Sequence, residues 1–389
     1  MAVGTVGSSK PSPGRIPSLD GLRALSIFLV LALHSLQRLE FTHHVSVLWY
    51  GIFNGATGVF IFFVISGYLI TSLLLKEHEK RGSISLRGFY FRRAMRILPP
   101  IYVYVGVLLL LGLANKLAID KLGVVSALFF FHDYAPGFMW TLEHFWSLSI
   151  EEQFYLVWPF LLLYCLRRPG PEGRWRAGKI AIAIIIVSPI IRILGFTLAR
   201  HTFLHNSYGI HARADSLMFG CLLALMQGHH HFERLYKVAT KIWWVPPAVV
   251  ILSDCLSAKY RNYWDFPFGF TLCGVAVSFF LLWCVRNPAS AVGRFLNSRP
   301  IVHLGVLSYS IYIWQTLFLN ESNLELFGPS LKLLYTFPFS WLAILLVAEV
   351  SYYLVEQPSL RLRNRLIQRF QLYASKRRTQ QASVPASKV

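Results

Sequence analysis

The first long apolar run, residues 18–38 (SLDGLRALSIFLVLALHSLQR), carries two ionisable side chains, Arg23 and His34. Eleven residues of α-helix rise about 16 Å and complete about three turns, so both side chains lie on one face of a helix. Ionisable groups inside a membrane helix are costly and usually face a bundle interior or a wet cavity. The pattern fits a functional axis along this helix, and it fits a structural pair that helps helices to pack equally well.

Apolar runs of this kind recur along the whole chain. They lie near residues 18–38, 56–75, 97–114, 148–166, 180–198, 213–227, 243–257, 267–285, 301–320 and 333–355. The run 122–131 is too short to cross a bilayer and is predicted to be re-entrant or external. The sequence therefore predicts an all-α, polytopic membrane protein with about ten transmembrane helices.

Composition and charge agree with this prediction. The chain is 55% hydrophobic and only 14% charged, with a mean hydropathy of +0.49, whereas a soluble domain carries about 25% charged residues. The net charge of +20 comes from basic residues between the apolar runs, so nucleic acid is not an expected partner. With the N-terminus inside, 28 Lys and Arg fall in inner segments and 8 in outer connections, which predicts that both termini are cytoplasmic.

The same pattern divides the chain into three parts. Residues 1–17 are predicted to be a flexible cytoplasmic tail, residues 18–360 the membrane domain, and residues 361–389 a basic cytoplasmic tail that anchors to anionic lipid. The five cysteines show no paired metal-ligand spacing, and the His229–His231 triplet lacks partner ligands. Neither a metal site nor a permanently bound cofactor is expected.

A basic cluster precedes the third apolar run in the string FYFRRAMRILPP. Arg92, Arg93 and Arg96 are three or four residues apart and can converge on one side of a helix. Arginine forks suit phosphate groups, although ordinary anchoring at the cytoplasmic surface explains one or two of the three. The spacing favours a phosphate site.

The segment WTLEHFWSLSIEEQFYLVWP places polar groups at the start of another apolar run. His144, Ser147 and Glu151 are spaced to share one helical face, with Trp146 beside them. A glutamate buried there can hold or relay a proton, whereas a glutamate at the water interface merely caps the helix. The capping alternative fits Glu152 better than Glu151.

Three further polar positions each allow two interpretations. Ser66-Gly67 lies in the middle of an apolar run, where glycine permits close helix packing or a loosened backbone beside a cavity. Arg213 and Asp215 either pair with each other or line an entrance on the outer side. Tyr309, in the ninth apolar run, either forms a hydrogen bond inside the bundle or belongs to an interfacial aromatic belt.

Seven strings, in order over about residues 15–360, resemble the integral-membrane acyltransferase family 3, of the sugar O-acetylase type. The strings are LDGLRALSIFLVLALH, FFVISGYLI, FRRAMRILP, HFWSLSIEEQFYLVWP, RADSLMFGCLLA, SYSIYIWQ and VEQPSLRLR. The chain departs from the family where many members end the string SYxxYxWH on histidine, because Gln315 stands there. Gln315 is therefore assigned no role in proton transfer.

The resemblance implies a ten-span bacterial enzyme of the inner (cell) membrane that moves an acyl group, commonly acetyl, from cytoplasmic acyl-CoA to a hydroxyl of a glycan or lipid-linked sugar. It implies that His34 and Glu151 are catalytic, with His34 as general base. It also implies that the acyl-CoA donor is bound by Arg23, Arg93, Arg96, Ser66 and Gly67. Candidates for acceptor binding or for support of the site are His144, Trp146, Ser147, Arg213, Asp215 and Tyr309.

A different class of protein fits the same charges. A proton-coupled transporter of a polar or anionic substrate would also place His34, Glu151 and the arginines inside a bundle of ten spans. Against it, no pair of matching broken spans is found in the two halves of the chain. The acceptor, the acyl length, the partner that orients His34 and the oligomeric state are left open by the sequence.

Overall fold

The computed structural model describes residues 16–40, 46–135, 139–168, 170–200, 202, 207–319 and 333–382. Within these residues the chain is built of helices and contains no strand, which confirms the predicted all-α class. Residues 1–15 of the predicted N-terminal tail and residues 383–389 of the C-terminal tail lie outside the described part.

Seven helical segments are long and apolar enough to cross a membrane. They are built on α1 (Pro17–Glu40), α3 (Gly55–Arg81), α4 (Leu86–Leu113), α7 (Pro171–Leu198), α13 (Phe270–Arg286), α15 (Arg299–Leu319) and α16 (Phe339–Ser351). Each coincides with one of the apolar runs of the sequence. A protein with this many apolar helices is a multi-pass membrane protein.

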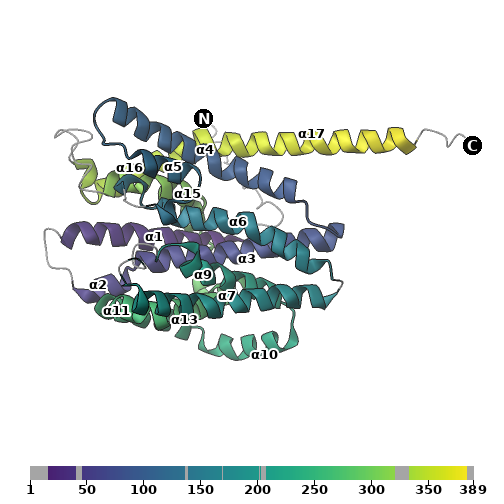
Figure 1. Ribbon diagram of the computed structural model, residues 1–389, viewed down its shortest axis with the longest axis horizontal. Coiled ribbons are helices and arrows are strands. Elements are labelled where there is room, and N and C mark those ends of the chain that lie inside the picture. The colour runs from purple at the N-terminus through teal and green to yellow at the C-terminus, as the bar shows by residue number, and fades with distance from the viewer. Residues whose placement is uncertain are drawn as a thin grey trace, which may run out of the picture.

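The other three predicted spans are also helical, but they are weaker candidates for crossing. α9 (Ile210–Met226) has 17 residues and α11 (Val245–Tyr260) has 16, against the roughly 20 residues that a bilayer core requires. α6 (Phe145–Leu166) is long enough with 22 residues but contains two glutamates. α6 packs against α3 and α7, and these helices lie along the same direction as α1 in the bundle (Figure 1). The count of ten spans stays a prediction.

The basic loops meet at one end of the bundle, called here the basic-loop end. Glu79, near the end of α3, forms an ion pair with Arg174 in the first turns of α7. Glu77 of α3 pairs with Arg92 of α4 across the intervening loop, with 3.1 Å between Nη2 and Oε2. Two of the basic connections, residues 76–96 and 167–179, therefore lie at the same end of the bundle.

Apolar side chains cover the outside of the bundle as well as its core. Leu110 and Leu113 of α4, Leu198 of α7 and Leu354 after α16 are among the most exposed side chains of their segments. Water would penalise such a surface, whereas lipid tails solvate it. The charged groups described below lie inside, which is the arrangement expected for a membrane bundle.

Glycines let the central helices approach closely. A Cβ at Gly67 of α3 would clash with the carbonyl oxygen of Leu217 in α9, and a Cβ at Gly220 of α9 would clash with that of Val64 in α3. Gly305 of α15 meets α1 in the same way. Small residues at such crossings are typical of membrane helices.

Short helices close the ends of the bundle. They are α2 (Val47–Ile52), α5 (Lys121–Leu128), α10 (His230–Ala239), α12 (Asn262–Trp264) and α14 (Ala291–Leu296), with 3-10 turns at His132–Tyr134, Trp140–Leu142 and Thr240–Ile242. π-Turns at Asp265–Gly269 and Tyr352–Glu356 precede α13 and α17 (Gln357–Ala382). α5 overlaps the run 122–131 and, at eight residues, rises only about 12 Å.

α17 extends well beyond the bundle (Figure 1). It begins before residue 360, the predicted boundary between the membrane domain and the basic tail, and continues through that boundary without a break. The division into a domain and two tails stays a prediction.

Candidate active site

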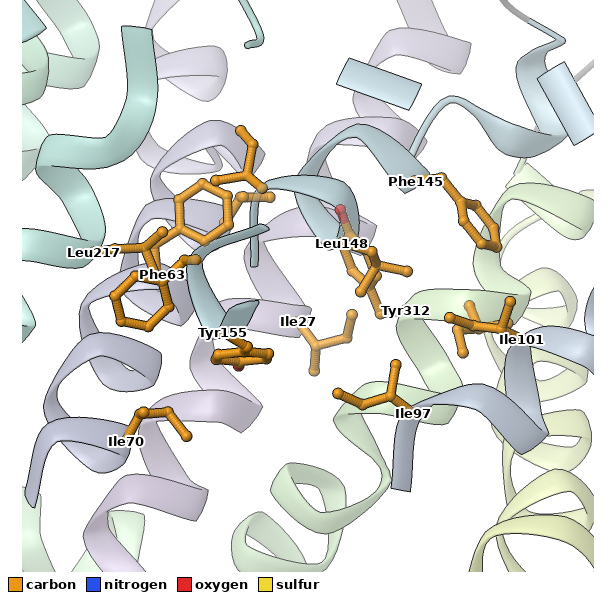
Figure 2. Close-up of a cluster of buried hydrophobic side chains, with 14 of the residues drawn as sticks. Ile27, Phe63, Ile70, Ile97, Ile101, Phe145, Leu148, Tyr155, Leu217 and Tyr312 are labelled. Carbon is orange, nitrogen blue, oxygen red and sulfur yellow. The ribbon is translucent and has the colours of Figure 1, made fainter. Parts of the chain in front are cut away.

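A cavity lies in the core among α1, α3, α4, α6 and α15, and we call it the arginine cavity. Its volume is about 100 Å³. Figure 2 shows apolar and aromatic side chains around the same region, including Phe63 of α3, Ile97 of α4, Tyr155 of α6 and Tyr312 of α15. Segments that are far apart in the sequence therefore build one interior site.

Three guanidinium groups line the arginine cavity, and all three were predicted to bind an acyl donor. Arg23 of α1 is paired with Asp20, with 3.1 Å between Nη1 and Oδ1. Arg93 and Arg96 enter from α4, one helical turn apart. Arg92 is not among the lining residues, because its side chain pairs with Glu77 outside the cavity.

Two glutamates of α6 face these arginines. Glu151 and Glu152 both line the cavity, and Glu151 interacts with Arg93, Ser66 and Arg23. The sequence singled out Glu151 and treated Glu152 as a cap at the water interface. The structure corrects that distinction, because Glu152 also faces the interior of the bundle.

The two halves of the predicted Ser66-Gly67 element have different positions. Ser66 lines the arginine cavity and shares a short hydrogen bond with the hydroxyl of Tyr155. Gly67 is absent from the cavity lining and packs against α9 instead. For Gly67 the structure therefore favours close packing, one of the two alternatives that the sequence left open.

A chain of hydrogen bonds closes the cavity on the side away from the basic loops. Ser147 of α6 and Tyr312 of α15 line the cavity, and their hydroxyl oxygens lie 2.5 Å apart. The Tyr312 hydroxyl also donates to the carbonyl oxygen of His144 at 3.2 Å. The buried His144 ring lies 3.3 Å from the Thr316 hydroxyl through Nδ1. His144 therefore supports the wall of the cavity without lining it.

Tyr309 lines the same cavity from α15. Its hydroxyl donates to the carbonyl oxygen of Ile97 at 2.7 Å, next to Pro99 and Pro100 inside α4. Pro99 and Pro100 lack the N–H groups that would bond to the carbonyls of Met95 and Arg96, and the Tyr309 hydroxyl adds a hydrogen bond one residue further along the helix. Tyr309 is thus part of the site and of its scaffold, and not of an interfacial aromatic belt.

His34 lies apart from the arginine cavity. Its Nδ1 atom is 3.1 Å from Oε1 of Gln37, and its ring packs edge-to-face on Trp140. It is close enough to His144 to interact electrostatically. Within the described residues His34 forms no hydrogen bond or ion pair with Glu151, and the side chain that orients its ring is Gln37.

A second cavity, which we call the aspartate cavity, lies at the end of the bundle opposite the basic loops. Its volume is about 190 Å³, and two predicted residues, Trp146 and Arg213, line it. Asp215 does not, because its carboxylate is buried in an ion pair with Arg192 of α7 at 2.8 Å. Neither predicted alternative for Asp215, pairing with Arg213 or lining an entrance, is what the structure shows.

Sequence reasoning missed several buried polar residues. Arg192 is a single arginine within an apolar run, and the rule for ionisable groups in membrane helices could have identified it. Tyr155 follows Glu151 by four residues and therefore shares its helical face. Glu356, in the string VEQPSLRLR, is buried, accepts a hydrogen bond from Ser310 and interacts with Arg96; no spacing in the sequence connects it to the arginines.

Comparisons with known proteins agree with this architecture. The O-acetyltransferase OatA of Staphylococcus aureus is 30% identical over 371 residues, which cover 89% of this chain and 57% of the relative. The peptidoglycan O-acetyltransferase OatA of Listeria monocytogenes is 31% identical over 373 residues, which cover 88% of this chain and 55% of the relative. The chain thus spans little more than half the length of these curated relatives, and no solved structure matches it. The family model described as an acyltransferase domain matches residues 16–353, so the chain belongs to the acyltransferase family 3 that its sequence strings resemble.

Proposed function

We propose that this chain is a membrane O-acetyltransferase that moves an acetyl group from acetyl-CoA to a hydroxyl of a cell-wall glycan. The observation that carries the proposal is the arginine cavity, where three guanidinium groups and two glutamates lie inside a bundle of apolar helices. Charged side chains inside a membrane bundle are costly unless they pair with an oppositely charged group or bind a ligand. Membership of the acyltransferase family and relatives named O-acetyltransferases support the same activity.

In this proposal the arginine cavity, with a volume of about 100 Å³, holds the phosphate groups of the donor and not the whole of acetyl-CoA. Arg23, Arg93 and Arg96 bind phosphate groups of acetyl-CoA through charge-assisted hydrogen bonds, and the Ser66 hydroxyl lies beside them. The donor enters from the basic-loop end. We place this end, together with both termini, on the cytoplasmic side of a bacterial cell membrane. Its acetyl end then points toward Ser147 and Tyr312, away from the phosphates.

The transfer step needs a base for the acceptor hydroxyl, and His34 is the proposed base. As the hydroxyl oxygen attacks the thioester carbonyl, its proton passes to the imidazole. The carbon–sulfur bond then breaks, the acetyl group stays on the acceptor oxygen, and the CoA sulfur leaves with the proton that His34 returns. His34 lies beyond His144 and Tyr312, so the acetyl end of the donor has to reach past Tyr312. Transfer through an acetyl-histidine is a variant of the same route.

The acceptor class comes from the relatives and not from the cavity itself. One relative is named a peptidoglycan O-acetyltransferase, and a glycan strand offers many hydroxyls on the outer side of the cell membrane. A lipid-linked sugar would present the same chemistry to the enzyme. The glycan therefore approaches from the end of the bundle opposite the basic loops.

Purified protein in liposomes tests the function with radiolabelled acetyl-CoA and solubilised peptidoglycan glycan. We expect alkali-labile label on the glycan, and His34→Ala is expected to lower kcat by about 10²–10⁴-fold. His303→Ala serves as the matched control, because His303 is exposed and paired with Glu349 at the basic-loop end. Full activity of the His34→Ala protein would overturn the role of His34.

The same experiment separates the enzyme from the transporter considered above. Label that becomes esterified to glycan identifies an acetyltransferase. Movement of a labelled substrate into the liposomes without any ester would identify a carrier and overturn the proposal. No observation in the structure favours the carrier.

A further inference from the structure

The aspartate cavity is built by the ends of five helical segments and is the larger of the two cavities described. It lies where α3 begins, where α6 and α9 begin, and where α11 leads into α13. These ends are opposite the basic loops. A solute arriving from that side of the membrane therefore meets this cavity, and not the arginine cavity, first.

Asp254 is the most buried charged side chain of the aspartate cavity, with 6% of its surface exposed. Its Oδ1 atom accepts hydrogen bonds from the Thr57 hydroxyl at 2.8 Å and from the Asn54 amide at 3.1 Å. Its Oδ2 atom has no hydrogen-bond partner among the described residues. Because Oδ2 is not sealed inside the protein, it faces the cavity, and the cavity is suited to a ligand that donates hydrogen bonds.

Asp265 shows the same arrangement in this cavity. Its Oδ2 atom accepts a hydrogen bond from the Ser257 hydroxyl at 2.8 Å. Its Oδ1 atom likewise has no hydrogen-bond partner in the part of the chain that the structure describes. Two carboxylates thus each present one oxygen that is free to accept.

Arg213 supplies donors beside these acceptors. Its Nε atom donates to the carbonyl oxygen of Ser207 at 3.1 Å, whereas its two terminal amino groups make no hydrogen bond with any described residue. The guanidinium lies 3.9 Å from the centre of the Phe270 ring and about as close to Trp146 as to Tyr208, at 6.0 Å and 5.8 Å. The wall therefore combines flat aromatic faces with one fixed cation.

The balance of charge distinguishes the two cavities. The arginine cavity has three guanidinium groups against two carboxylates, whereas the aspartate cavity has one guanidinium against two carboxylates. A phosphate or another anion would be repelled by Asp254 and Asp265. A neutral ligand rich in hydroxyls can donate to both aspartates and accept from Arg213.

The volume of the aspartate cavity limits the size of the ligand that it can bind. One water needs about 10–15 Å³ of cavity volume, so about 190 Å³ holds on the order of a dozen non-hydrogen atoms. A single sugar ring is of that size. Its hydroxyl edge matches the carboxylates, and its C–H face matches Trp146 and Tyr208, which pack on each other with ring centroids 5.0 Å apart.

The position of the cavity fits an acceptor that receives an acyl group from the arginine cavity. Val59 and Phe63 line both cavities, and Phe63 packs edge-to-face on Trp146 with ring centroids 6.1 Å apart. Ser147, the neighbour of Trp146 in sequence, lines the arginine cavity. Phe63 and Trp146 therefore form an aromatic layer between the two spaces, called here the Phe63–Trp146 layer.

Resting on the function proposed above, we infer that the aspartate cavity binds one neutral sugar ring of the acceptor glycan through Asp254, Asp265 and Arg213. The sugar hydroxyls donate to the two carboxylates, and Arg213 donates to a sugar oxygen. These residues bind and position the acceptor and take no part in proton transfer.

Kinetics with two substrates test the inference in the purified full chain. Acetyl-CoA is the donor, and chitotetraose, a neutral and soluble amino-sugar oligomer, is the acceptor probe. Asp254→Asn and Asp265→Asn are each expected to raise the KM for chitotetraose about 10-fold or more, because a hydrogen bond to a charged group is worth about 1.5–3 kcal/mol. The KM for acetyl-CoA should stay within about twofold of wild type. Glu172→Gln, at an exposed ion pair in the first turn of α7, is the matched control.

Direct binding keeps this test separate from the test of the overall function. Calorimetric titration of chitotetraose needs no acetyl transfer, so it gives a result even if the wild-type protein forms no ester. Weaker binding by both asparagine variants, with unchanged thermal stability, supports the inference. Equal binding by wild type and both variants, no binding by wild type, or displacement of chitotetraose by millimolar inorganic phosphate would each overturn it.

Discussion

The guanidinium carbon of Arg93 lies 4.8 Å from the centre of the Tyr155 ring. Arg93 comes from α4 and Tyr155 from α6, so the contact joins two walls of the arginine cavity. A cation over an aromatic face is held in place without using its hydrogen-bond donors. The donors of Arg93 therefore remain available for an anionic ligand, which explains why an arginine can be both fixed and functional here.

Tyr155→Leu is expected to raise the KM for acetyl-CoA by about 3- to 30-fold, because it removes a cation–π interaction worth about 0.5–2 kcal/mol. Tyr155→Phe keeps the ring and loses only the hydrogen bond with Ser66. Its KM for acetyl-CoA should lie close to the wild-type value. Initial rates at saturating acceptor measure both variants, and equal KM values for the phenylalanine and leucine proteins would contradict the role of the ring.

Replacing Arg93 and Arg96 together by alanine should raise the KM for acetyl-CoA by about 100-fold or more, since each arginine supplies charge-assisted hydrogen bonds of about 1.5–3 kcal/mol. Arg92→Ala is the matched control, because Arg92 is on the same helix but pairs with Glu77 outside the cavity. Its KM should change by less than about threefold.

A truncated donor shows whether phosphate recognition causes the effect. Acetyl-pantetheine carries the same thioester and none of the nucleotide phosphates. Wild type should prefer acetyl-CoA strongly over acetyl-pantetheine, and the double variant should lose most of that preference. A preference retained in full would mean that Arg93 and Arg96 only anchor the loop.

The sequence predicted the helices well because each long apolar run is itself the segment that contacts lipid or the core of the bundle. It also predicted that Arg23, Arg93, Arg96, Ser66 and Glu151 belong to one site, and the arginine cavity brings these five together. Their spacing on single helices and the strings shared with a known family carried that information. Their roles in catalysis and donor binding stay predictions.

Interactions between helices were harder to predict. The partner of Asp215 is Arg192, on the helix before it, and the nearby Arg213 was the obvious but wrong choice. Spacing along one helix cannot show which neighbour a side chain meets across a helix interface. Arg23 and His34 share one helix, yet only Arg23 lines the arginine cavity.

Arg192→Met should destabilise the protein severely. The arginine pairs with Asp215 at 2.8 Å, and both side chains are almost fully excluded from solvent. Removing one partner of such a pair leaves a buried charge and costs about 3–5 kcal/mol. The half-life of the detergent-solubilised protein on heating, followed by monodisperse size-exclusion, should fall accordingly.

The double variant Arg192→Met with Asp215→Asn tests whether the unpaired carboxylate causes this loss of stability. It removes the uncompensated carboxylate and should recover a large part of the lost half-life, even though it contains more changes than the single variant. If the double variant were less stable than Arg192→Met, the loss would come from the hydrogen bonds that Arg192 donates to the carbonyls of Ala212 and Phe266 and not from the unpaired charge.

Acid should loosen α10 from the basic-loop end. Arg286 makes two hydrogen bonds to Glu233, at 2.6 Å and 2.8 Å, and this pairing holds the pKa of Glu233 below its ordinary value of 4.5. A carboxylate with a lowered pKa contributes stability above that ordinary value and loses it as the pH falls through the lowered pKa. Hydrogen-exchange protection of residues 230–239 should therefore fall below about pH 4.5. Glu233→Gln should show low protection that hardly depends on pH in this range.

The Phe63–Trp146 layer should keep water from the acetyl thioester. Phe63→Leu removes an edge-to-face aromatic pair worth about 0.5–1.5 kcal/mol. The equilibrium constant for opening of the layer should therefore rise by about 2- to 10-fold. Hydrolysis of acetyl-CoA without acceptor should rise by a similar factor, while transfer to glycan rises less. Phe154→Leu makes the same change at a buried position of α6 that lines neither cavity and controls for general loosening of the core. Equal hydrolysis by the two variants would show that the layer between the cavities is not what excludes water from the thioester.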